Sequence, residues 1–369
     1  MNTLIGRLGR RALFAFDPET AHGLSIAALS TGLAGRCRGT QSPRLRTTLC
    51  GLEFPNPLGM AAGYDKNAEV PDALLALGFG FAEVGTVTPR PQAGNPKPRI
   101  FRLTEDGAVI NRLGFNNEGH DRAYARLTAR AGRAGIVGVN IGANKDSADR
   151  IADYEAGVRR FAALAGYLTV NISSPNTPGL RDMQARGALA ELLSRVVAAR
   201  DAVAVSDAGA GRRTPIFLKI APDLHQADLE DIAAEVGDKG IDGVIVSNTT
   251  ISRPALRNRA HPAETGGLSG RPLFDLSTTV LARMRRLVGP RRVLVGVGGV
   301  DSTESAIEKI RAGADLVQLY TGMIYAGPGL PGRIVQGMSD FAEREGLRSI
   351  ADIRDSAVDR WADRRLAGD

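Results

Sequence analysis

Continuous apolar runs recur along the chain at fairly regular spacing, and each has the length of a buried strand. They cover residues 58–63, 81–87, 135–142, 167–174, 216–222, 243–249, 293–299 and 316–322. Such continuous runs are typical of parallel strands covered on both faces, because a strand with one face in water alternates apolar and polar positions. Alanine-rich or charged helical stretches, such as residues 188–203 and 228–235, lie between the runs. The pattern therefore predicts alternating strands and helices.

Eight strand-helix units over this length match the number and spacing of the units in a (β/α)8 TIM barrel, which takes roughly 250 residues. A doubly wound open sheet is the alternative, but it normally carries a Gly-x-Gly-x-x-Gly turn after its first strand, and residues 58–66 have none. The barrel is therefore favoured. The gaps after the second, fourth and sixth runs are the longest, and residues 88–117 are rich in Pro, Gly, Arg and Asn. We expect insertions there over the active face, including a small hairpin.

Polar residues or glycines end nearly every run, and in a barrel all of these ends meet at one rim. The richest cluster is residues 171–181, Asn-Ile-Ser-Ser-Pro-Asn-Thr-Pro-Gly-Leu-Arg. Its amides and hydroxyls suit a flat polar ligand such as a pyrimidine. The alternative for this segment alone is a proline-rich connection with capping residues.

Three glycine-containing segments indicate an anion site near the last strands. Gly298-Gly299 and Gly322 follow the seventh and eighth runs, and residues 266–270 look like a third, flexible loop. Backbone N–H groups in such turns approach phosphates closely, so a phosphate-bearing cofactor is expected. Lys219 would place a cation inside the apolar barrel, where it needs an anionic partner.

Composition limits the possible domain size, ligands and cellular location of the protein. The chain has 369 residues, 43% of them hydrophobic, which is enough for one barrel-sized core or two smaller ones. Its net charge of +7 comes mostly from arginine and favours an anionic cofactor, an acidic substrate or an anionic lipid surface, but is too diffuse to indicate nucleic acid. Cys37, Cys50 and four scattered histidines show no metal-ligand spacing. No apolar run is long enough to cross a bilayer and no signal peptide is visible, so we expect a cytoplasmic protein able to touch a membrane.

The first forty residues predict a pair of short helices. Leu4, Leu8, Ala12 and Ala15 recur at helical spacing beside Arg7, Arg10 and Arg11. Asp17-Pro18-Glu19 resembles the cap and first turn of a second helix that carries Leu24, Ala28 and Leu29. The pair either lies in an anionic membrane surface or packs on the flank of the barrel. We expect residues 1–40 to form this extension and residues 41–369 the catalytic barrel.

Several longer motifs resemble those of the dihydroorotate dehydrogenases, in particular the membrane-associated, quinone-reducing class. The resemblance spans about residues 17–335, and its motifs are residues 61–67 (AAGYDKN), 83–89 (EVGTVTP), 111–117 (NRLGFNN), 171–181, 247–250 (SNTT) and 267–273 (GLSGRPL). It implies FMN at the carboxyl rim, held by Ala62, Gly63, Lys66, Thr86, Asn140, Asn171, Lys219, Ser247, Gly270, Gly299, Tyr320 and Thr321. It implies a dihydroorotate site formed by Lys66, Asn111, Arg112, Leu113, Gly114, Phe115, Asn171, Asn176, Asn248 and Thr249.

The implied reaction oxidises (S)-dihydroorotate to orotate in de novo UMP synthesis and passes the electrons through FMN to quinone. It removes a proton and a hydride from adjacent carbons, so a base must face the flavin across the substrate. By analogy with the family, that base is Ser174, and Thr177 is a candidate for its proton path. His22 and Arg102 match positions along the quinone path, and the implied location is the cytoplasmic face of the cell membrane.

Two alternatives remain open at this stage. Fumarate or a nicotinamide could replace quinone as electron acceptor, although Ser174 and the N-terminal extension count against it. The chain could also be a catalytically silent barrel that binds a phosphorylated ligand. Residues 336–369 form a charged helical tail, and Trp361 is expected to dock it on the barrel.

Overall fold

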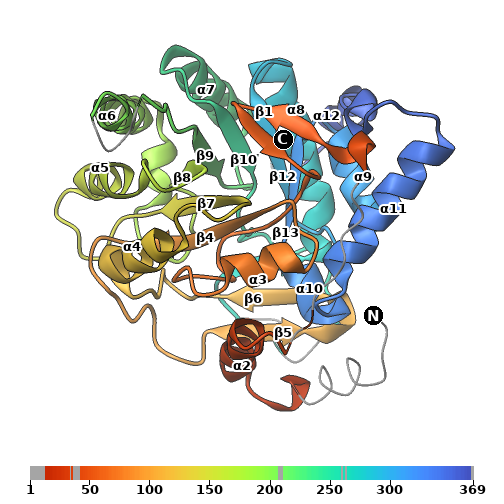
Figure 1. Cartoon of the computed structure of the whole chain (residues 1–369), viewed down its shortest axis with the longest axis horizontal. Coiled ribbons are helices and arrows are strands. Elements are labelled where there is room, and N and C mark those ends of the chain that lie inside the picture. The colour runs from red at the N-terminus through yellow and green to blue at the C-terminus, as the bar shows by residue number, and fades with distance from the viewer. Residues whose placement is uncertain are drawn as a thin grey trace.

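A computed structural model describes residues 13–33, 35, 42–206, 211–258, 261 and 264–366. Eight parallel strands close into a barrel at its centre (Figure 1). Around the barrel they follow the order β3 (Leu58–Met60), β4 (Phe81–Val87), β7 (Ile136–Ile141), β8 (Tyr167–Asn171), β9 (Ile216–Ile220), β10 (Gly243–Val246), β12 (Val293–Val297) and β13 (Leu316–Leu319). The predicted (β/α)8 TIM barrel is confirmed, and the open sheet is excluded.

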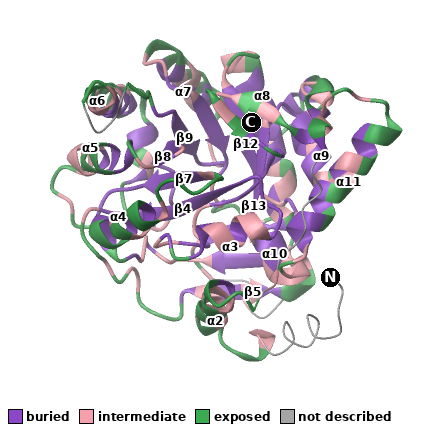
Figure 2. Ribbon diagram, in the orientation of Figure 1, coloured by how far each residue is buried: buried purple, intermediate pink, exposed green. Residues whose placement is uncertain are grey.

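Helices surround the barrel and bury their apolar faces against it (Figure 2). They are α3 (Pro71–Ala76), α4 (Gly119–Arg130), α5 (Arg150–Phe161), α6 (Arg186–Ala204), α7 (Gln226–Asp238), α8 (Phe274–Val288), α9 (Thr303–Arg311), α10 (Thr321–Ala326) and α11 (Leu330–Arg344). Short 3-10 turns lie in the connections between elements: η1 (Pro43–Leu45), η2 (Thr104–Asp106), η3 (Arg181–Gln184), η4 (Arg271–Leu273) and η5 (Ile350–Ile353). The two helical stretches predicted from composition fall within α6 and α7.

Aromatic side chains fill the barrel interior. The Phe81 and Tyr167 rings lie 6.2 Å apart, and Gly138 makes room for them because a Cβ there would come within 2.1 Å of the Tyr167 ring. A hairpin of β1 (Thr47–Leu49) and β2 (Leu52–Phe54) closes the amino end, where Phe54 packs edge-on against Phe81 at 5.3 Å. The core is therefore packed solid at this end, which leaves the carboxyl end for a ligand.

A three-stranded antiparallel sheet lies outside the barrel. Its strands β5 (Ile100–Leu103) and β6 (Ala108–Asn111) form the hairpin predicted within residues 88–117. The third strand, β11 (Gly267–Gly270), pairs with β6. The expectation of a flexible loop at residues 266–270 was therefore wrong: pairing with a distant segment holds these glycines in a strand.

The second predicted N-terminal helix is present as α2 (Pro18–Ser30). The Asp17 carboxylate accepts hydrogen bonds from the backbone N–H groups of Glu19 and Thr20, as the capping pattern predicted. The helix packs against β5, at the bottom of Figure 1. Most of the first predicted helix, including Leu4, Leu8 and its arginines, lies outside the described residues, as does Cys37. The domain boundary at residue 40 stays a prediction.

The C-terminal tail docks on the barrel through Trp361, as expected. Trp361 lies in α12 (Val358–Ala362), is 4% exposed and packs edge-on against the Phe274 ring at 5.9 Å. Its indole N–H also donates to Glu308 at 2.6 Å.

Candidate active site

A cavity of about 1040 Å3 opens at the carboxyl ends of the barrel strands. This is slightly above the usual range for a small-molecule site, about 300–1000 Å3. It brings together most of the predicted site residues: His22, Ala62, Gly63, Lys66, Thr86, Arg102, Asn111, Leu113, Gly114, Phe115, Asn171, Ser174, Asn176, Lys219, Ser247, Asn248, Thr249, Gly270, Gly299, Tyr320 and Thr321. Among the predicted residues, Asn140 and Arg112 do not line it.

Asn140 supports the cavity wall from behind. It is fully buried, and its Oδ1 accepts hydrogen bonds from Thr86 Oγ1 at 2.5 Å and Asn171 Nδ2 at 3.2 Å. Its Nδ2 donates to Glu83 at 2.7 Å. Asn140 therefore orients two side chains that do line the cavity.

The Arg112 side chain is turned away from the cavity. Its guanidinium pairs with Glu264 at 2.5 Å and lies over the Phe101 ring at 4.6 Å. Its neighbours Asn111 and Leu113 line the cavity, so this segment forms part of the cavity wall without placing the Arg112 charge there.

A buried cation, Lys219, lines the cavity, and a buried carboxylate, Glu83, lies near it in the barrel interior. Lys219 is 5% exposed, and no hydrogen bond joins its ammonium to another described residue. Burial lowers the pKa of Lys219, and the nearby charge of Glu83 opposes this shift. Glu83 accepts hydrogen bonds from Tyr167 at 3.0 Å and Gln318 at 2.8 Å, which suits a carboxylate. Lys219 is therefore placed to meet a negative charge inside the cavity.

Lys66 joins the polar part of the cavity to α2. Its Nζ lies 3.4 Å from Nε2 of His22. Burial lowers the pKa of Lys66 to about 8 and that of His22 to about 3. The imidazole is therefore neutral near pH 7 and can accept a hydrogen bond from the ammonium.

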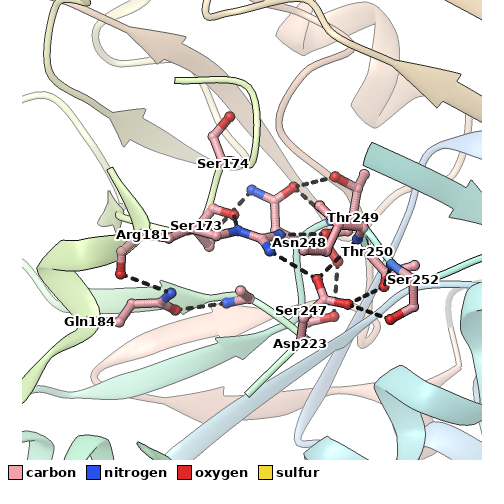
Figure 3. A network of polar contacts seen from close by, with 12 residues as sticks. Ser173, Ser174, Arg181, Gln184, Asp223, Ser247, Asn248, Thr249, Thr250 and Ser252 are labelled. Atoms are coloured by element: carbon pink, nitrogen blue, oxygen red, sulfur yellow. Dashed lines mark hydrogen bonds and ion pairs between the residues drawn. The ribbon is translucent and has the colours of Figure 1, made fainter. Parts of the chain in front are cut away.

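The two serines of the Ser173-Ser174 pair play different roles. Ser173 Oγ donates to Asn171 Oδ1 at 2.8 Å and accepts from Asn248 Nδ2 at 3.0 Å. Ser174 points away from that network (Figure 3), lines the cavity and accepts one hydrogen bond, from the backbone N–H of Asn176 at 3.2 Å. Of the pair, only Ser174 can reach a ligand. Thr177 is buried, and no direct hydrogen bond between its hydroxyl and that of Ser174 is present in the described structure.

The turn at Gly298-Gly299 has a backbone conformation that favours anion binding. Both residues have positive φ, 112° and 75°, and a Cβ on Gly299 would come within 2.5 Å of Phe274. Only glycine fits this turn without strain, and its bare backbone can approach a phosphate. Thr321 borders the same part of the cavity and donates to Ser269 at 2.9 Å.

One end of the cavity is apolar, next to the N-terminal segment for which the sequence predicted an amphipathic extension. It is lined by side chains of α2, of the segments just before and just after it, and of α10: Leu13, Phe14, Leu24, Leu33, Met323 and Ile324. Arg102 borders this end, stacks on Phe14 at 4.7 Å and donates to the Leu13 and Phe16 carbonyls. The only signal in the sequence was the amphipathic character of the N-terminal segment.

Comparison with known proteins identifies the family of the chain. The family model described as dihydroorotate dehydrogenase matches residues 44–341. A protein of Mesorhizobium japonicum named dihydroorotate dehydrogenase (quinone) is 72% identical over 99% of this chain and 100% of its own length. A Brucella ovis protein of the same name is 65% identical over 99% of this chain and 100% of its own. The crystal structure of the Eimeria tenella dihydroorotate dehydrogenase with ferulenol superposes with a TM-score of 0.86 at 40% identity, covering 92% of this chain and 95% of that one. The chain therefore belongs to the dihydroorotate dehydrogenase family, whose members are oxidoreductases.

Proposed function

We propose that this protein oxidises (S)-dihydroorotate to orotate in de novo pyrimidine synthesis and passes the electrons through FMN to a quinone. The observation that carries the proposal is one continuous cavity whose polar part holds Lys66, Ser174 and the asparagines and whose other end is apolar at α2. The names of the curated relatives, which include quinone, support the same reaction and acceptor.

The cavity fits FMN in two respects. The Gly298-Gly299 turn offers backbone N–H groups to a phosphate, and Lys219 offers a buried cation to the ring. We assign to FMN the residues Ala62, Gly63, Lys66, Thr86, Asn171, Lys219, Ser247, Gly270, Gly299, Tyr320 and Thr321, with Asn140 acting behind Thr86 and Asn171. When bound, FMN supplies the hydride acceptor that no amino-acid side chain can provide.

The substrate lies over the flavin in this proposal. Lys66 pairs with its carboxylate, and the amides of Asn111, Asn171, Asn176 and Asn248 bind its ring, with Leu113, Gly114, Phe115 and Thr249 around it. Ser174 accepts the proton, because its hydroxyl faces the cavity while that of Ser173 is held between two asparagines. No direct hydrogen bond joins the described hydroxyls of Thr177 and Ser174, so a proton path through Thr177 needs a water between them.

We place the quinone at the apolar end, beside His22 and Arg102. Phe16, Leu24 and Leu33 are 49%, 43% and 82% exposed around this opening, and such apolar side chains favour contact with a lipid surface. Within the described residues no helix is long and apolar enough to span a bilayer. A peripheral position at the cytoplasmic face of the cell membrane agrees with both observations.

Turnover with alternative acceptors tests the proposal against its rival. We expect a short-chain ubiquinone analogue to support dihydroorotate oxidation at saturating substrate, and fumarate or NAD+ to support little or none. Rapid turnover with fumarate or NAD+ and none with quinone would reject the quinone assignment while keeping the substrate.

Substrate affinity should depend on the protonation of Lys66. Its pKa is about 8 in the free site, so the side chain is positively charged below that pH and neutral above it. We expect the affinity for orotate, measured through the flavin absorption change, to weaken as the pH rises above about 8. Lys66→Arg should remove this dependence, because a guanidinium stays protonated there. The same fall in the arginine variant would show that another group titrates.

A charge at the apolar opening should impair only the second half of the reaction. Leu24 lines the cavity from α2 and is 43% exposed. We expect Leu24→Glu to raise the KM for quinone by about tenfold or more, because an ionised carboxylate is poorly tolerated beside an apolar ligand. The rate of flavin reduction by dihydroorotate should be unchanged. Ser30→Glu adds the same charge at an exposed α2 residue that does not line the cavity and is the matched control. Equal effects of both variants would remove the opening from the quinone path.

A further inference from the structure

One guanidinium ties together three loops at the carboxyl end of the barrel (Figure 3). Arg181 Nε donates to the Ser173 carbonyl at 3.1 Å, and its Nη2 donates to the Thr249 carbonyl at 3.0 Å. Its Nη1 pairs with Asp223 at 3.0 Å. The three partners lie in the segments that follow β8, β10 and β9, so a single side chain sets the spacing of these segments.

Asp223 extends the connection to residues 250–252. Its carboxylate accepts hydrogen bonds from Thr250 Oγ1, from the backbone N–H of Ile251 at 3.1 Å and from Ser252 Oγ at 3.1 Å. The Arg181 and Asp223 side chains are 20% and 11% exposed, so both charges are largely removed from water. Loss of either partner therefore leaves a charge with poor compensation.

The bond to the Ser173 carbonyl bears directly on Ser174. A peptide unit is planar, so a fixed Ser173 carbonyl also fixes the amide nitrogen and Cα of Ser174. Arg181 stands at the other end of the same loop, so its hydrogen bond to Ser173 links the two ends of residues 173–181. Its bond to the Thr249 carbonyl fixes the backbone beside a second cavity residue, Thr249 itself.

We propose that Arg181 and Asp223 form a positioning pair that sets where the Ser174 hydroxyl stands relative to Asn248 and Thr249 on the opposite loop. The inference rests on the proposed function of Ser174. It gives Arg181 a role that a lysine cannot fill, because three acceptors in different loops require the planar fork of a guanidinium. Neither member of the pair lines the cavity, so the pair acts through the loops that it holds.

The test compares Arg181→Lys and Asp223→Asn with Arg186→Lys. Arg186 is a matched control, because it lies five residues further along, pairs with Asp231 and Glu235 and is 59% exposed. We expect both pair variants to retain flavin and to be reduced about 10- to 100-fold more slowly at saturating dihydroorotate, since small displacements of a reacting group have effects of this size. The control should be reduced at the rate of the unaltered protein.

A double-mutant cycle separates positioning from general damage. In a Ser174→Ala background, Arg181→Lys should cause little further loss, because the group that it positions is already absent. The proposal would be overturned if the rate losses of Arg181→Lys and Ser174→Ala multiply fully in the double variant. A normal rate of flavin reduction in Arg181→Lys, or release of flavin by both pair variants, would also overturn it. If dihydroorotate fails to reduce even the unaltered protein, the proposed function itself is wrong, and that result is distinct from all of these.

Discussion

Replacing Ser174 with alanine is expected to leave FMN bound and to slow flavin reduction by dihydroorotate about 100- to 10,000-fold near neutral pH, the usual contribution of a general base. The hydroxyl lies on the cavity wall, accepts one hydrogen bond from the Asn176 backbone and is 5% exposed. Alanine removes only the proton acceptor, so the loss should fall on the chemical step. Stopped-flow absorbance under anaerobic conditions measures that step directly.

Ser174→Cys provides a rescue variant. A thiol has an ordinary pKa near 8.5, far below that of an alcohol, so it ionises more easily. We expect this variant to recover part of the lost rate and to reach its maximum at lower pH than the serine protein does. If Ser174→Ala is reduced at the normal rate, Ser174 takes no part in proton removal, and another group must be sought.

Lys219→Met is expected to lower the midpoint potential of the bound flavin and to slow its reduction. Lys219 lines the cavity as a buried cation, and methionine keeps much of its length without the charge. A unit charge about 4 Å away contributes about 4 kcal/mol at intermediate dielectric constant, which corresponds to about 90 mV for a two-electron couple. Because negative charge accumulates on the ring as it is reduced, removal of the cation disfavours reduction. Spectroelectrochemical titration measures the shift.

Glu83→Gln is the control of opposite sign for that experiment. Glu83 lies in the barrel interior near Lys219 and accepts three hydrogen bonds, from Asn140, Tyr167 and Gln318. Glu83 also helps to keep Lys219 protonated, so the comparison requires a pH low enough for Lys219 to stay charged in the variant. At that pH, removing the negative charge of Glu83 should raise the midpoint potential, whereas Lys219→Met lowers it. A fall of the potential in both variants at that pH would contradict an electrostatic role for Lys219.

The barrel was readable from the sequence because buried parallel strands leave continuous apolar runs. The second run, residues 81–87, matches β4 residue for residue. Other runs were predicted too long at their carboxyl ends; the first, for example, was expected over residues 58–63, whereas β3 ends at Met60. Beyond that point the chain turns to line the cavity, and hydrophobicity does not distinguish a strand from such a turn.

Features that depend on distant partners were not readable. β11 is four residues long and half glycine, and pairing with β6 and with Thr250 holds it in a strand. The orientation of Arg112 is set by Glu264, which lies 152 residues later in the chain. The pairing of Arg181 with Asp223 likewise requires three loops to meet. Glu83 did leave a signal, since an acidic residue within a continuous apolar strand needs a buried partner.

The visible spectrum of the purified protein under anaerobic conditions tests the central claim most directly. Dihydroorotate should bleach the flavin absorption, and a soluble ubiquinone analogue added afterwards should restore it, which would establish cofactor, substrate and acceptor in one cuvette. A protein without flavin absorption, or one whose flavin dihydroorotate does not bleach, would contradict the proposed reaction; bleaching that quinone fails to reverse would contradict the assignment of the apolar end of the cavity.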